Sequence, residues 1–383
     1  MITNASPAAP VAVRRPAGDT GRRIRVLIVD DSALVRRVLS EELSRYPDID
    51  VVGTAVDPYA ARERIVALDP DVLTLDIEMP RMDGLAFLEK LMRHRPMPVV
   101  IVSSIAPEQS AAALRALSLG AVEVVGKPGS AFSVPDVGQR LVHAIRAAAH
   151  ARMPDPVRAA APVPQAPHAA PVVRPSLAGI STTHQVLAIG ASTGGTRAIE
   201  EVLRALPPST PGTLIVQHMP AGFTRSFAER LNGICPMQVR EAEDGAIVMP
   251  GVALVAPGGY HMVLHRSGAS LSVRIKDGPP VHHQRPAADV TFQSVARVMG
   301  QNALGVLLTG MGADGAKGLL AMREAGAWTA AQDEASCVVF GMPREAIELG
   351  AAIEVHALTD MAGAVQRAMA LSPERRASRL VPA

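Results

Sequence analysis

The chain has 383 residues and a formal net charge of +2, so it is long enough for two domains and lacks the charge excess of a nucleic-acid-binding protein. Hydrophobic residues make up 48% of it and aromatic residues only 3%, enough for two apolar cores but not for stacking surfaces that bind single-stranded nucleic acid. Its two cysteines form no CxxC motif, and it shows neither a signal peptide nor a stretch of about 18 apolar residues, so we expect a cytoplasmic protein without membrane insertion.

Residues 1–22 are rich in Ala, Pro, Gly and Arg without a hydrophobic period, and we expect a disordered tail. From residue 23 onward, short β-branched runs alternate with amphipathic stretches such as 32–46 and 83–95. The expected strands are 24–30, 51–55, 71–76, 98–104 and 121–127. This alternation predicts a doubly wound parallel sheet over residues 23–145, with ligands bound at the carboxyl ends of its strands.

Pro and Ala dominate residues 146–183, which predicts an extended interdomain linker. The α/β pattern then resumes, and we expect a second doubly wound domain over residues 184–372, followed by a tail over 373–383. Its expected parallel strands are 185–192, 212–218, 303–310 and 327–332. Residues 252–277 alternate in polarity and contain glycine turns, which predicts an antiparallel hairpin inserted beside the parallel sheet.

Polar residues stand at the strand ends of the first domain. Asp30 and Asp31 follow the first strand and Asp76 follows the third, which we expect to lie beside it. Converging carboxylates repel one another unless a hard cation lies among them, and Mg²⁺ prefers such oxygen ligands. Asp76 can then attack a phosphoryl group, with Lys127 and Ser103 binding the phosphoryl oxygens. A single aspartate at a strand end is more often an ordinary polar residue, but the combination favours a phosphate acceptor.

With its motifs LDIEMPRMDG, VSS and GKP, the first domain resembles the flavodoxin-like receiver domain of response regulators. The resemblance implies phosphorylation that depends on Mg²⁺. It also implies the following roles: Asp76 as phosphoacceptor, Asp30, Asp31, Asp76 and the backbone carbonyl of Glu78 as metal ligands, Ser103 as switch residue and Lys127 as phosphate-binding lysine.

The second domain carries a G-x-S-x-G motif, GASTG at 190–194, directly after an apolar strand. Small residues suit any tight turn between strand and helix, so the motif alone leaves a structural role for Ser192 equally open. His218 and Asp314 also end apolar strands, and a serine nucleophile needs an imidazole base oriented by a carboxylate. Other histidines remain available as the base: His261, His265, His282 and His283. The sequence satisfies neither the G-x-G-x-x-G nor the P-loop pattern of nucleotide-binding proteins.

Five segments in order resemble the CheB family of chemotaxis methylesterases: AIGASTGGTRAIE, VQHMPAGFTRSFAERL, VALVAPGGYHM, RPAADVTFQSVA and LLTGMGADGAKGLLAMREAG. The resemblance implies a parallel-sheet methylesterase domain, with Ser192 as nucleophile, His218 as base and Asp314 as its partner. The amides of Thr193 and Met311 are the implied oxyanion donors. The implied activity is methyl-ester hydrolysis and glutamine deamidation on methyl-accepting chemotaxis receptors, without a cofactor for the esterase chemistry. The implied phosphodonor is a CheA-type histidine kinase.

A response regulator with a non-catalytic output is the competing interpretation. An output that binds DNA requires a helix-turn-helix and a basic recognition helix, and the sequence indicates neither. An output that only binds a partner has no need for a serine, a histidine and an aspartate at strand ends. Because a linker joins the two domains, we expect the unphosphorylated first domain to cover the Ser192 edge and phosphorylation of Asp76 to loosen that contact.

Overall fold

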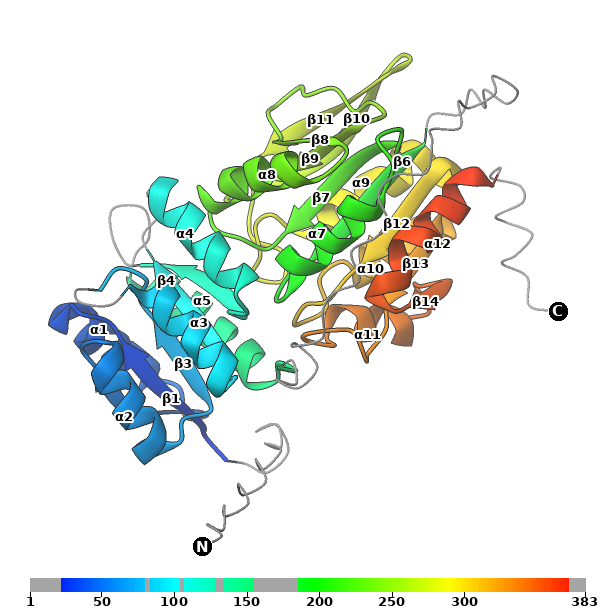
Figure 1. The fold of residues 1–383 in the computed structure, drawn as a ribbon. Coiled ribbons are helices and arrows are strands. Elements are labelled where there is room, and N and C mark those ends of the chain that lie inside the picture. The colour runs from blue at the N-terminus through cyan, green and yellow to red at the C-terminus, as the bar shows by residue number, and fades with distance from the viewer. Residues whose placement is uncertain (1–21, 80–82, 104–106, 128–133, 154–184, 372–383) are drawn as a thin grey trace, which may run out of the picture.

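The structure, a computed structural model, describes residues 22–79, 83–103, 107–127, 134–153 and 185–371. These ranges form two α/β domains that lie side by side (Figure 1). Residues 1–21 and 373–383 of the predicted tails and most of the predicted linker lie outside the described residues.

The described part of the first domain is a five-stranded parallel sheet in the order β2-β1-β3-β4-β5. Its strands are β1 (Ile24–Val29), β2 (Ile49–Ala55), β3 (Val72–Leu75), β4 (Val99–Ser103) and β5 (Glu123–Gly126). Its helices are α1 (Ala33–Leu43), α2 (Pro58–Leu68), α3 (Gly84–His94), α4 (Pro107–Ser118) and α5 (Val134–Ala149). All five predicted strands are therefore confirmed, and so is the doubly wound architecture.

Local sequence explains where these elements begin and end. β3 is buried at every position, as expected for a strand covered by helices on both faces. Three helices start at side-chain caps: Ser32 accepts from the Val35 amide, Asp57 from Ala60 and Asp83 from Leu85. Because β1 and β3 are neighbours, the residues that follow them meet at one edge of the sheet.

The second domain contains, among its described residues, a seven-stranded sheet in the order β14-β13-β12-β6-β7-β9-β8, in which every pair is parallel. The strands are β6 (Val186–Ala191), β7 (Gly212–Gln217), β8 (Gln238–Glu241), β9 (Val252–Val255), β12 (Ala303–Leu307), β13 (Trp328–Gln332) and β14 (Glu354–His356). The helices are α7 (Gly195–Ala205), α8 (Phe223–Ile234), α9 (Ala288–Met299), α10 (Ala316–Glu324), α11 (Met342–Glu348) and α12 (Leu358–Ala370), with a 3₁₀ turn at Gly300–Asn302.

The antiparallel hairpin is shorter than predicted. It consists of β10 (His261–Ser267) and β11 (Ser270–Lys276), whereas residues 252–255 form β9 inside the parallel sheet. All four β9 residues are buried, because this strand has neighbours on both sides and is covered on both faces. Its continuous apolar run, VALV, is typical of a buried parallel strand rather than of a half-exposed hairpin.

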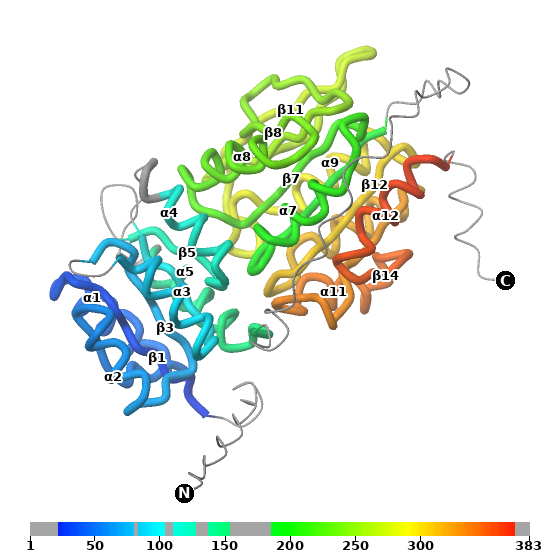
Figure 2. The backbone as a smooth tube through the Cα atoms, viewed as in Figure 1, coloured from blue at the N-terminus to red at the C-terminus, as the bar shows by residue number. Residues whose placement is uncertain are grey.

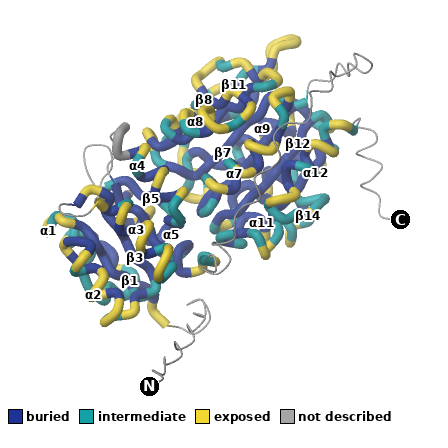
Figure 3. The backbone as a smooth tube through the Cα atoms, in the orientation of Figure 1, coloured by how far each residue is buried: buried dark blue, intermediate teal, exposed yellow. Residues whose placement is uncertain are grey.

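The two domains share an apolar contact. Helix α4 of the first domain packs against α7 and α8 of the second, as the tube view also shows (Figure 2). One buried hydrophobic cluster includes Leu114 and Leu117 of α4 together with Phe223 and Phe227 of α8. Residues coloured as buried continue through this contact in Figure 3. Beyond the end of α5, the Arg152 amide donates to the carbonyl of Val338 at 2.9 Å.

Candidate active site

The turn that follows β6 presents Ser192. The Ser192 amide donates to the Thr309 carbonyl at 3.0 Å, which ties the turn to the end of β12. Gly194 has a φ of +78°, and a Cβ there would lie 2.6 Å from Val338. A Cβ on Gly195 would lie 2.2 Å from Gln217 Oε1. The last two glycines of GASTGG are therefore needed to form the sharp turn from strand to helix.

His218 directly follows β7, the neighbour of β6, and pairs with Asp314. The distance from His218 Nε2 to Asp314 Oδ2 is 2.7 Å. The amides of Ala288 and Asp289 also donate to the Asp314 carboxylate, at 2.6 and 3.0 Å. Burial works to raise the pKa of Asp314, but the hydrogen bond and charge of His218 and these two amides hold it below its ordinary value. Asp314 is thus an anion suited to stabilise a protonated imidazole.

Sheet pairing brings Ser192 and His218 to the same edge. The His218 amide donates to the Ala191 carbonyl at 3.1 Å, and Gln217 Nε2 donates to the carbonyls of Ser192 and His218 at 2.9 and 3.1 Å. His218 Nδ1 is buried and has no hydrogen-bond partner within the described ranges, whereas Nε2 is engaged by Asp314. Sequence reasoning missed Gln217, since only the pairing of β6 with β7 reveals that it spans both residues.

Two loops flank Ser192 with backbone amides. Thr193 follows the serine, and Met311 lies in the glycine-rich loop after β12, the other neighbour of β6. The Thr309 hydroxyl fixes both loops, because it donates to the Thr193 carbonyl at 3.0 Å and accepts from the Val339 amide at 3.0 Å. The glycine-rich loop lies close to the serine, since a Cβ built on Gly310 would be 2.7 Å from Ser192 Cβ. The role of the Thr193 and Met311 amides as oxyanion donors stays a prediction.

The other histidines have different partners. His261 Nδ1 accepts from the Ala287 amide, and His282 lies 3.1 Å from Asp289. His282, Asp289 and Asp314 also form one of two clusters of potential metal ligands among the described residues. Both Asp314 oxygens are already engaged by His218 and by backbone amides, so we do not assign this cluster as a metal site.

A second site lies at the carboxyl edge of the first domain. Ligand oxygens of Asp30, Asp31 and Asp76 lie within 4.8 Å of one another, a donor set that suits a hard divalent cation. Lys127 Nζ lies 2.9 Å from Asp30 Oδ2 and 2.7 Å from Asp76 Oδ2. Burial raises the pKa of Asp76 although Lys127 opposes this shift. Burial lowers the pKa of Lys127, but Asp76 and Asp30 raise it above its ordinary value overall.

The remaining predicted residues of this site are nearby. Ser103 ends β4 and is buried, and its carbonyl accepts from the Lys127 amide at 2.8 Å. The Glu78 amide donates to Asp76 Oδ1 at 3.3 Å, so the Glu78 backbone lies beside the predicted phosphoacceptor.

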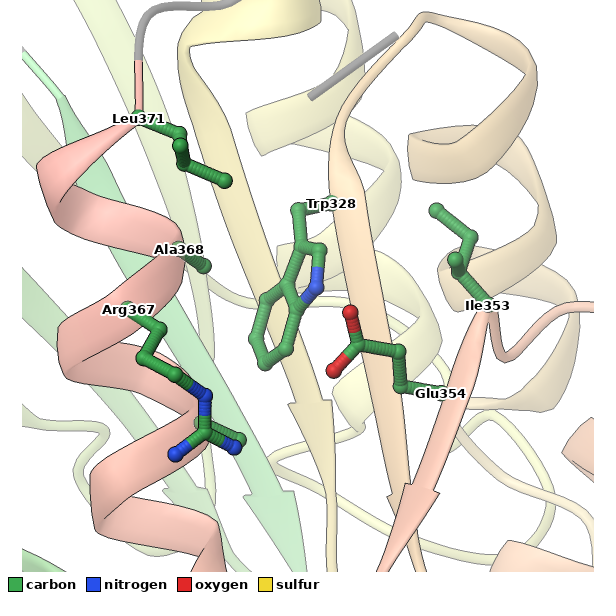
Figure 4. A pocket seen from close by; sticks show the side chains of 7 residues that line it. Trp328, Ile353, Glu354, Arg367, Ala368 and Leu371 are labelled. Carbon is green, nitrogen blue, oxygen red and sulfur yellow. The ribbon is translucent and has the colours of Figure 1, made fainter. Parts of the chain in front are cut away.

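A pocket elsewhere in the second domain is separate from both sites. It lies between α12 and strands β13 and β14, and its lining includes Trp328, Glu354 and Arg367 (Figure 4). Trp328 is the first residue of β13, so the pocket lies at the amino end of that strand, opposite the edge that carries Ser192. We assign it no part in the chemistry at Ser192.

Comparison with known families identifies the class of both domains. The family model described as CheB methylesterase matches residues 187–365, and that of the response regulator receiver domain matches residues 26–134. The chain is thus a receiver domain joined to an α/β methylesterase domain.

Relatives of full length share this arrangement. A protein-glutamate methylesterase/protein-glutamine glutaminase of Syntrophus aciditrophicus is 56% identical over 90% of this chain and 99% of its own length. Its counterpart in Paraburkholderia xenovorans is 54% identical over 92% of this chain and 99% of its own length. The crystal structure of the Thermotoga maritima CheB methylesterase catalytic domain is 36% identical and covers 48% of this chain and 97% of its own, with a TM-score of 0.47. The chain belongs to the family of protein-glutamate methylesterases/protein-glutamine glutaminases.

None of the helices in the described ranges is both long and apolar enough to cross a membrane.

Proposed function

We propose that this protein removes methyl groups from glutamate γ-methyl esters, and deamidates glutamines, on the cytoplasmic helices of methyl-accepting chemotaxis receptors. Relatives that align with nearly the whole chain carry the names of both activities. The observation that carries the proposal is the 2.7 Å pair of His218 and Asp314 at the sheet edge that also presents Ser192. We place the enzyme in the cytoplasm, where these receptor helices lie.

In the proposed reaction, the Ser192 hydroxyl attacks the ester carbonyl as His218 Nδ1 takes its proton. The imidazolium forms next to the ionised Asp314, which stabilises it. The amides of Thr193 and Met311 stabilise the negative oxygen of the tetrahedral intermediate. Methanol leaves with the proton from His218, and water then hydrolyses the acyl-enzyme by the same route. A glutamine side chain follows the same steps and releases ammonia.

The decisive experiment measures methanol release from methylated receptor membranes. We expect Ser192→Ala to lower the rate by at least about 10³-fold, because no other group can form the acyl-enzyme. A variant of an exposed serine, Ser44→Ala at the C-cap of α1, is the matched control and should retain the wild-type rate. Equal release from wild type and Ser192→Ala would remove the esterase assignment.

For the receiver domain, we propose phosphorylation of Asp76 by a CheA-type histidine kinase. Asp30, Asp31, Asp76 and the carbonyl of Glu78 would hold Mg²⁺, supported by the cluster of carboxylate oxygens within 4.8 Å. Bound Mg²⁺ would neutralise charge on the incoming phosphoryl group. Lys127 pairs with the Asp76 carboxylate at 2.7 Å. Ser103, at the end of the neighbouring strand β4, would bind the phosphoryl oxygens.

We further propose that the unphosphorylated receiver covers the catalytic edge. Ser192 and His218 are only 3% and 7% exposed in the full chain, too little for a receptor helix to reach them. Phosphorylation would shift the population towards an open arrangement. If this is right, a small phosphodonor such as phosphoramidate activates the wild type but leaves Asp76→Asn at its basal rate. Equal activation of both proteins would refute Asp76 as the acceptor.

A further inference from the structure

The side chain of Glu123 belongs to the receiver but lies at the catalytic site of the other domain. Glu123 is the first residue of β5, and the Thr193 hydroxyl donates a hydrogen bond of 2.7 Å to its Oε2. Thr193 directly follows Ser192 and is fully buried. The charge of His218 also reaches this carboxyl and acts to lower its pKa. Glu123 therefore lies beside the nucleophile turn, in contact with the residue that follows Ser192.

The chemistry of Glu123 matches that of the proposed reaction. Hydrolysis of a glutamate methyl ester leaves a glutamate side chain whose γ-carboxyl must lie beside the same residues. Glu123 offers an identical carboxyl on a side chain of identical length. A neutral glutamic acid also has the shape of the methyl ester without its methyl group.

The surroundings of Glu123 favour this neutral form. Burial raises its pKa to about 7, although Thr193, His218 and the Val124 amide oppose the shift. Burial also lowers the pKa of His143 on α5, and the charges of His218, Arg146 and His283 act in the same direction. Burial thus disfavours the charged form of both Glu123 and His143.

We infer that Glu123 is a built-in product mimic, which occupies the position of the substrate's glutamate side chain whenever the receiver covers Ser192. This inference rests on the proposed esterase function and specifies how the covered site is kept empty of substrate. Inhibition then comes from a side chain that competes for the site as well as from the bulk of the receiver.

Other contacts hold the domains together without Glu123. Helix α4 packs on α8, and Arg152 bonds to Glu334 at 2.6 Å and to the Val338 carbonyl through its amide. Substitution of Glu123 therefore tests occupancy of the site rather than attachment of the receiver. Glu63, an exposed glutamate on α2 of the same domain, provides the matched control.

The test compares the unphosphorylated full-length proteins at about pH 6, where Glu123 is largely neutral. The readouts are methanol release from methylated receptor membranes and the rate at which a fluorophosphonate labels Ser192. We expect Glu123→Ala to raise kcat/KM about tenfold, the value of one hydrogen bond to a half-buried carboxyl. The gain should come mainly from a lower KM, as for loss of a competitor. Glu123→Asp, one methylene shorter, should do the same, whereas Glu123→Gln and Glu63→Ala should stay within about twofold of wild type. Labelling of Ser192 should accelerate in the Ala and Asp variants alone.

Two results would overturn the inference: a Glu123→Ala protein with wild-type kcat/KM and labelling, or a Glu123→Asp protein as inhibited as wild type. The second result would mean that any carboxyl at this contact suffices. A different result would refute the proposed function itself. If no variant releases methanol in a way that depends on Ser192, even after phosphoramidate treatment, the proposed function is wrong and this inference fails with it.

Discussion

At the residue scale, the carboxylate of Asp314 is the most strongly constrained group of the site. It accepts hydrogen bonds from His218 and from two backbone amides, and these hold its pKa below the ordinary value. Asp314→Asn keeps the size of the side chain but loses the charge that stabilises the imidazolium. We expect kcat to fall by about 10³–10⁴-fold with little change in KM, measured as methanol release.

The control for this prediction is Asp360→Asn, which changes an exposed aspartate at the start of α12. A loss of less than about tenfold in Asp314→Asn would mean that another carboxylate orients His218. Asp289, which is buried and donates its amide to Asp314, would then be the group to test next.

Gln217 links the backbones of the serine and the histidine. Its side chain is 1% exposed, and Nε2 donates to the carbonyls of both residues. Gln217→Glu replaces this donor with an acceptor that faces two carbonyl oxygens. We expect unfolding free energy to fall by about 1–3 kcal/mol and kcat by about 10–100-fold, with KM nearly constant.

Exposed Gln293 on α9 supplies the control, Gln293→Glu, which should match wild type in both measurements. A Gln217→Glu protein that loses stability but keeps its kcat would show that Gln217 only supports the fold.

How far the sequence anticipates these residues depends on whether they lie in a motif or only in a contact. Ser192, His218 and Asp314 each follow an apolar strand, and the carboxyl ends of parallel strands share one edge, so their convergence was predictable. Gln217 lies inside a strand, where its direction depends on sheet order. Glu123 reaches Thr193 only because two domains pack together, and no local pattern encodes that contact.

At the element scale, helix α9 supports the strand that carries the nucleophile. Phe292 of α9 is fully buried, and a Cβ built on Gly190 of β6 would lie 3.1 Å from its ring. Phe292→Ala removes this ring and leaves a cavity directly before Ser192. We expect the second domain to lose about 3–5 kcal/mol of unfolding free energy, measured by urea denaturation.

The control is Ile247→Ala, whose side chain is 48% exposed and should change stability by less than about 1 kcal/mol. Because the chain has two domains, the transition of the second must be followed by a local probe, and Trp328 of β13 is the chain's single tryptophan. A loss below about 1 kcal/mol in Phe292→Ala would show that neighbouring side chains close the cavity.

Elements with a long apolar or alternating pattern were predictable, and short ones were not. The strands from β1 to β5 follow the predicted ranges because each is a distinct β-branched run. β9 was assigned to a hairpin because its position before β10 outweighed its uninterrupted apolar sequence. β8 and β14 are short edge strands with polar residues, QVRE and EVH, and only their pairing with a neighbour defines them.

At the scale of the whole molecule, the titration of Glu123 couples pH to the arrangement of the domains. Its pKa is about 7 in this closed arrangement and returns towards the ordinary value of about 4.3 when the side chain is exposed. The closed arrangement therefore binds the proton more tightly than the open one. The extra stability that this proton gives the closed arrangement is fully present below about pH 4.3 and is lost as the pH rises through about 7.

We therefore expect the titration of Glu123 to make the basal activity rise with pH. This effect adds to any pH dependence of the catalytic step. Glu123→Gln removes the titrating group and keeps the shape, so the ratio of wild-type to Glu123→Gln activity cancels the pH profile that the two proteins share. We expect this ratio, measured on unphosphorylated proteins, to increase between about pH 5 and pH 7.5, by at most about tenfold per pH unit, and then to level off.

After phosphoramidate treatment the ratio should be independent of pH, because the open arrangement leaves Glu123 exposed. A ratio that is flat in both states would mean that Glu123 does not titrate with closure, whereas a ratio that falls with pH would mean that the closed arrangement prefers the carboxylate.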